Sequence, residues 1–72
     1  MNARIEDFGT GWFGIILALK SEEIDALVDK LQKLKAGTTS HFHFRSDFTA
    51  DGGVGDVEIT LQSASPDNMT IE

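Results

Sequence analysis

Two histidines, His41 and His43, are separated by one residue and are the only histidines in this chain of 72 residues. On a β-strand, side chains two positions apart project from the same face, with their Cα atoms roughly 6.5 Å apart. Both imidazoles can therefore turn toward one metal ion, and Glu58 or Asp56 on the following strand can supply a third ligand. Two histidines and a carboxylate form many zinc and iron sites. The pattern supports one alternative function, a metal-binding module or a small metal-dependent enzyme.

A structural explanation of the same residues competes with the metal site. In residues 40 to 48 a period of two places the phenylalanines on one face and His41, His43, Arg45 and Asp47 on the other, which predicts a strand. Residues 55 to 62 alternate in the same way and place acidic side chains on the polar side. Opposite charges across two strands stabilise a hairpin. We therefore prefer ordinary surface or interface histidines, and we expect no cofactor and no metal.

Catalysis finds little support in the sequence. A dyad of His43 and Glu58 is chemically possible, because a carboxylate can orient an imidazole and favour its charged form. The chain has no nucleophile elbow, and its glycine clusters at 9 to 11 and 52 to 55 lack the spacing and the lysine of a phosphate-binding loop. We expect a protein that is not an enzyme.

Composition narrows the class of partner. Twelve acidic and six basic residues give a net charge of −6, which opposes binding to nucleic acid or to an anionic membrane. The longest apolar run, residues 12 to 19, falls far short of the ~20 residues that cross a bilayer. The chain has no cysteine, and its first residues lack the pattern of an export signal. These features predict a cytoplasmic protein, with a basic protein as its favoured partner.

The pattern of apolar residues predicts the main elements. Residues 12 to 19 are apolar on both faces and rich in β-branched and aromatic side chains, as in a central strand. A helix is predicted from 21 to 36, with Ser21 as its N-cap and Gly37 as its C-terminal cap. Its apolar side chains recur at steps of three and four and form one stripe: Ile24, Leu27, Val28, Leu31 and Leu34.

The two alternating segments predict a hairpin that turns through residues 49 to 53. Phe44 must lie opposite either Val57 or Ile59 if apolar side chains are to meet. The Ile59 register would place two carboxylates, those of Asp47 and Asp56, face to face. We prefer the Val57 register, which pairs Arg45 with Asp56 and His43 with Glu58.

These elements predict a single α+β domain over residues 1 to 72. The expected order is strand, helix, strand, strand, with the helix packed on one face of an antiparallel or mixed sheet of three to five strands. Residues 3 to 8 fit either a first strand or an irregular lead-in, and residues 69 to 71 a short edge strand. The side chains expected beneath the helix are Phe42, Phe44, Phe48, Val57, Ile59 and Leu61.

The opposite sheet face would then combine two large apolar side chains with charged ones. Such a surface suits a contact with another protein or with a second copy of the chain. The residues predicted to form this partner-binding face are Trp12, Ile16, His41, His43, Arg45, Asp47, Asp56 and Glu58.

The order of helix, His-x-His strand, glycine turn and acidic strand over residues 17 to 61 resembles immunity protein 32, a family of small bacterial proteins that neutralise polymorphic toxins. The resemblance implies an acidic protein that binds and occludes a toxin domain without catalysis. Two alternatives stay open: the metal-binding module of His41, His43 and Glu58, and a small structural or regulatory homodimer.

Overall fold

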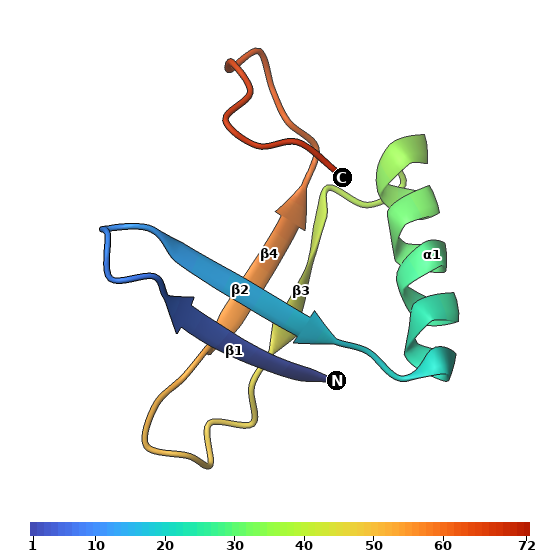
Figure 1. The fold of residues 1–72 in the computed structure, drawn as a ribbon. Helices are drawn as coiled ribbons and strands as arrows, with labels where there is room; N and C mark the ends of the chain where they lie inside the picture. Colours follow the sequence, from blue (N-terminus) through green and yellow to red (C-terminus); the bar gives the residue numbers. More distant parts are fainter.

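The computed structural model describes all residues from 1 to 72 and consists of two β-hairpins joined by one helix (Figure 1). In chain order the elements are β1 (Asn2–Asp7), β2 (Phe13–Ala18), α1 (Ser21–Ala36), β3 (His41–Arg45) and β4 (Asp56–Thr60). The predicted α+β class is confirmed. The expectation of one sheet is wrong, because β1 pairs only with β2 and β3 pairs only with β4.

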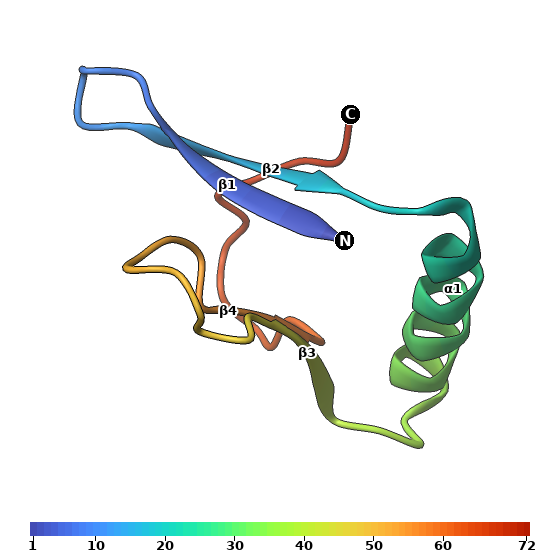
Figure 2. The same ribbon diagram turned by 90° about the horizontal axis from the view of Figure 1, so that it is seen from below.

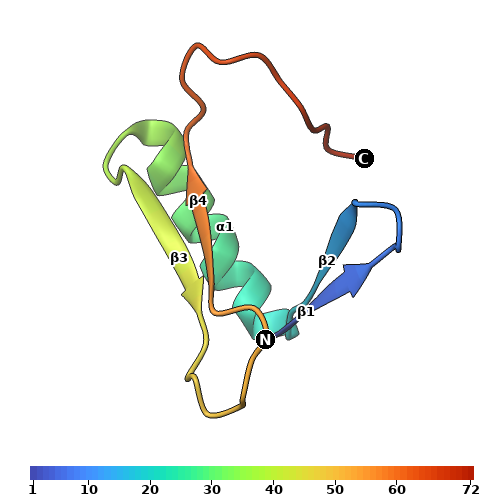
Figure 3. The same ribbon diagram turned by 90° about the vertical axis from the view of Figure 1, so that its left-hand side faces the viewer.

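The two hairpins lie in separate layers that α1 connects along one side (Figure 2). They spread apart from the corner near the N-terminus, so that their far ends do not meet (Figure 3). The arrangement follows from residues 3 to 8, for which the sequence allows either a strand or an irregular lead-in. Most of them belong to β1, which gives β2 an antiparallel partner of its own. The strand β2 is therefore not central in a larger sheet.

The β1–β2 hairpin has one apolar face. Its register places Ile5 opposite Ile15 and Ala3 opposite Leu17, so that these side chains share a face. Gly9 and Gly11 in the connection have φ angles of 71° and 94°, in the left-handed region that suits glycine. The backbone N–H of Gly9 also donates to Oδ1 of Asp7 at 2.8 Å, which closes the turn.

The helix begins one residue earlier than the predicted cap implies. Lys20 is the N-cap and Ser21 is the first helical residue, so the expectation of a serine cap is wrong. The carboxylate of Glu23 caps this end of the helix instead. It accepts the N–H of Lys20 at 2.9 Å and an N–H of the Met1 ammonium at 3.0 Å. The ammonium, followed by the Lys20 N–H, holds the pKa of Glu23 below its usual value.

The predicted C-terminal cap of α1 is confirmed. Gly37 has a φ of 79° and donates its N–H to the carbonyl of Leu34. The next N–H, of Thr38, donates to the carbonyl of Lys33 at 3.1 Å. This pair of bonds satisfies two carbonyls that the end of the helix would leave free.

No helix in the structure is both long and apolar enough to cross a membrane.

The core is small. Only Leu34 of α1 and Phe42 of β3 are buried, with 4% and 9% of their surface exposed. The predicted core residues Phe44, Val57 and Ile59 are half-buried. Two others lie outside the core, because the strands end before them: Phe48 follows β3 and is 71% exposed, and Leu61 follows β4 and is 58% exposed. The expected edge strand at residues 69 to 71 does not form.

Candidate polar site on the second hairpin

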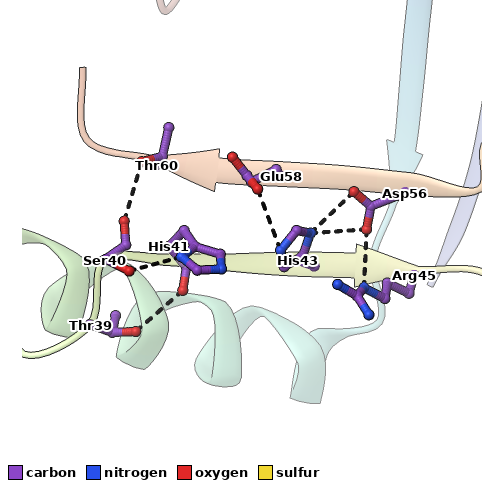
Figure 4. A network of polar contacts seen from close by, with 8 residues as sticks. All are labelled: Thr39, Ser40, His41, His43, Arg45, Asp56, Glu58 and Thr60. Carbon is purple, nitrogen blue, oxygen red and sulfur yellow. Dashed lines mark hydrogen bonds and ion pairs between the residues drawn. The ribbon is translucent and has the colours of Figure 1, made fainter. Parts of the chain in front are cut away.

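The β3–β4 register confirms the preferred pairing. Phe44 lies opposite Val57, which places His43 opposite Glu58 and Arg45 opposite Asp56. The polar side chains consequently occupy one face of the hairpin, as the alternation predicts. Figure 4 shows how they point toward one another across the two strands.

His43 is held between two carboxylates. Its Nδ1 lies 3.0 and 3.1 Å from the two oxygens of Asp56, and its Nε2 lies 3.5 Å from Oε1 of Glu58 (Figure 4). Arg45 binds the same aspartate as His43, because its Nε donates to Oδ1 of Asp56 at 3.2 Å. Only 20% of the His43 side chain is exposed, compared with 45% for Asp56 and 52% for Glu58. The imidazole is therefore the fixed centre of a net acidic cluster.

His41 lies on the same face, at the first residue of β3. Its Nδ1 is 2.8 Å from the hydroxyl oxygen of Ser40, and its ring stands edge-on to that of His43 at 5.1 Å between centroids. Thr60 closes this end by donating its hydroxyl to the carbonyl of Ser40 at 3.2 Å. Neither Ser40 nor Thr60 is among the predicted site residues, although both lie within the two alternating segments. Their positions next to and opposite His41 were the available signal.

The structure brings the three predicted metal ligands together. Donor atoms of His41, His43 and Glu58 all lie within 4.8 Å of one another. Asp56, the other carboxylate considered as a ligand, is within hydrogen-bond distance of Nδ1 of His43. It can orient the ring as a carboxylate commonly does behind a metal-bound histidine. Zinc lies roughly 2 Å from each of its donors, so the three side chains would have to move closer together to hold it.

Asp47 does not belong to this face. It lies in the loop after β3, where its carboxylate accepts the backbone N–H of Thr49 at 3.1 Å and the Thr49 hydroxyl at 2.9 Å. These bonds, the backbone bond first, lower the pKa of Asp47 below its usual 3.8. The lowered pKa means that this turn stabilises the fold above about pH 4. The contribution is lost as the pH falls through the lower pKa of the folded state.

Trp12 and Ile16 are also separate from the histidines. Ile16 lies on β2 opposite Arg4, and Trp12 precedes β2 in the turn of the first hairpin, where 76% of its surface is exposed. The expectation that they share a sheet face with His41 and His43 is therefore wrong. The reason is topological, since β2 and β3 belong to different sheets.

A cleft of about 600 Å³ lies between the hairpins and was not expected from the sequence. Ala3 of β1, Glu23 of α1 and Phe44 of β3 contribute to its lining. Arg45 of the polar site also borders this cleft, whereas the two histidines do not line it, so the cleft and the polar site meet at Arg45. The cleft marks where the two layers approach each other without closing.

No family model, curated protein or solved structure matches this chain. The chemistry of the site thus rests on its geometry. An exposed, charged and internally bonded strand face can bind a complementary protein surface, and its two histidines and Glu58 can bind a divalent metal ion.

Proposed function

We propose that this chain is a non-catalytic protein-binding module of the immunity type, which acts in the bacterial cytoplasm and occludes a basic toxin domain. The observation that carries the proposal is the bonded polar face of β3–β4, where Asp56 and Glu58 are about half exposed while their contacts to His43 and Arg45 fix their positions. Side chains ordered before binding lose less entropy when a partner arrives.

Charge and exposure support the same function. The chain carries a net charge of −6, which speeds its encounter with a basic partner. Trp12 offers a second contact, because an exposed tryptophan is the kind of side chain that anchors protein interfaces. The likeness of residues 17 to 61 to immunity protein 32 is a third support.

Neutralising the acidic face should weaken partner binding. The natural candidate for the partner is the protein encoded next to this chain, since an immunity protein protects the cell that makes its toxin. We expect Asp56→Asn with Glu58→Gln to weaken binding to that protein by roughly tenfold, measured by calorimetry, because two charges at the contact are lost. Protection of cells that express the toxin should fall in parallel.

A matched control changes the same charge elsewhere. Glu22→Gln with Asp25→Asn also removes two negative charges, but from exposed positions on the first turns of α1. This variant should bind within about twofold of the original chain, because only the long-range field changes. Equal weakening by both variants would show that the net charge of the chain, and not the polar face, causes the loss of binding. If the original chain neither binds the adjacent protein nor protects cells that express it, the proposal of a toxin partner is wrong.

A metal-binding module is the second candidate function, favoured by the convergence of His41, His43 and Glu58. Zinc bound to the folded chain at a hundred times its Kd would add about 2.7 kcal/mol to the free energy of unfolding. For a chain of this size that corresponds to a rise in Tm of roughly 10 °C or more. The measurement is a thermal melt with and without zinc, iron or manganese, together with elemental analysis of dialysed protein.

Two variants separate this metal site from weak surface binding. Glu58→Gln removes one of the three ligands, whereas Glu6→Gln makes the same change on β1, away from the cluster. Zinc should raise the Tm of Glu6→Gln and leave that of Glu58→Gln nearly unchanged. A metal response that is the same in both variants, or absent in the original chain, rules out the site.

A further inference from the structure

The chain exposes far more surface than a compact protein of its size. Its accessible surface is 6346 Å². A compact monomer of 7.9 kDa would expose about 4,400 Å². The radius of gyration is 14.1 Å, compared with roughly 11 Å for a compact domain of this length. The excess of about 1,900 Å² per chain is large for a protein that folds alone.

Much of this exposed surface is apolar and lies on regular elements. On the apolar face of the first hairpin, Ile5 is 54%, Phe13 is 62% and Ile15 is 57% exposed. No third strand extends this hairpin, and an isolated two-stranded hairpin is only marginally stable in water. The face therefore needs a cover that this copy of the chain does not provide.

The helix has a second uncovered surface. Leu34 is buried and Leu27 is half-buried, whereas Ile24, Val28 and Leu31 are 49%, 46% and 43% exposed. These three residues are spaced four and three apart, so they form a row on one side of α1. Three of the five residues of the apolar stripe are therefore largely in contact with water. A partner that covered them would gain about 25 cal/mol for each Å² of apolar surface removed from water.

We propose that a second copy of this chain covers both surfaces, so that the folded unit is a homodimer in which the first hairpin and the helix row of each copy pack on the other. The area favours this occupant. Two copies together carry about 3,900 Å² of excess surface over their whole length, and obligate dimer interfaces bury roughly 2,000–5,000 Å² in total, so the two apolar surfaces need to supply about half of the excess.

Charge favours a second copy over a different protein. The two surfaces are mainly apolar, and the one charged residue paired within the hairpin face is Asp7, at its end opposite Phe13, where its carboxylate accepts the N–H of Gly9. The surfaces therefore offer little for recognising a basic partner. An acidic chain can pair with itself there, because most of its carboxylates lie elsewhere, including the polar face of β3–β4. A permanent cover must also be present whenever the chain is made, and another copy always is. The inference is independent of the proposed function and leaves that polar face free.

Sedimentation equilibrium of the full chain, without any partner, tests the dimer. We expect a mass of twice 7.9 kDa at micromolar concentration, and a Tm that rises with protein concentration because dissociation and unfolding are coupled. A monomer of 7.9 kDa at 100 times that concentration, with a Tm independent of concentration, overturns the proposal. The two surfaces would then belong to another protein or to the C-terminal segment of the same chain.

A matched pair of variants tests the surface. Phe13→Ser removes a 62% exposed phenylalanine from the apolar hairpin face, and Phe48→Ser removes a 71% exposed one from the loop after β3. Phe13→Ser should weaken dimerisation at least tenfold, and Phe48→Ser less than twofold. Val28→Ser, on the helix row, repeats the test should Phe13→Ser fail to fold by circular dichroism. Equal effects of Phe13→Ser and Phe48→Ser, or no effect of Phe13→Ser and Val28→Ser, overturn the assigned surface.

Discussion

Replacing Phe42 with alanine is expected to unfold most of the protein at 25 °C. Phe42 is one of two buried side chains, and its ring meets that of Phe44 edge-on at 5.8 Å. Removing a buried phenylalanine costs about 3–5 kcal/mol. A core in a chain this short supplies about the same amount, so little stability remains. Urea unfolding followed by circular dichroism, at a fixed protein concentration, measures the loss.

Phe48→Ala is the matched control for this prediction. Phe48 is also a phenylalanine near β3, but 71% of its surface is exposed. Its replacement should change the free energy of unfolding by less than about 0.5 kcal/mol. The comparison decides between the observed core and the one predicted from alternation, in which both rings are buried. Similar losses in the two variants would contradict the structure.

Leu34→Ala is the second prediction with a large effect. Leu34 is 4% exposed and is the only buried residue of α1. The loss of its side chain should cost about 2–5 kcal/mol, of which the better helix propensity of alanine returns only a few tenths. The helix would then lose its one buried side chain. The free energy of unfolding in urea, measured at the same protein concentration, checks the value.

Leu61→Ala provides the control for Leu34. Leu61 follows β4 and is 58% exposed, so its truncation leaves no cavity and should cost less than about 1 kcal/mol. An unfolding free energy for Leu34→Ala that lies within 1 kcal/mol of that of Leu61→Ala would show that α1 is not anchored through Leu34.

The two predictions also separate the core within one chain from the surfaces between chains. Losses at Phe42 and Leu34 remove packing inside one copy, whereas Phe13 and Val28 are more than two-fifths exposed and act through the proposed dimer. Variants of the first kind should lower the Tm at every protein concentration. Variants of the second kind should change how steeply the Tm depends on concentration.

Local sequence patterns predicted the second hairpin well. Alternation placed His41, His43 and Arg45 on one face, and the charges of the facing residues selected the register that the structure has. The reason is that a slip of one residue would move every apolar side chain to the wrong face, and the other allowed register would oppose two carboxylates. The bounds of α1 and its Gly37 cap were predictable for similar local reasons.

The candidate metal cluster was predictable to the same extent. Two histidines at a spacing of two and a glutamate opposite one of them must lie close together once the register is fixed. The role of Asp56 behind His43 was not predicted, because it depends on the rotamers of both side chains. The loop position of Asp47 was missed, since Phe48 extends the period of two beyond the point where β3 ends.

By itself, the sequence determined the helix, the second hairpin and which residues share a face. Only the tertiary structure decided that β1 pairs with β2, that the four strands form two sheets, and that Trp12 and Ile16 lie apart from the histidines. The physical reason is that alternation sorts side chains between the two faces of a strand. The backbone groups at a strand edge are alike in every strand, so the pattern does not say which edges meet.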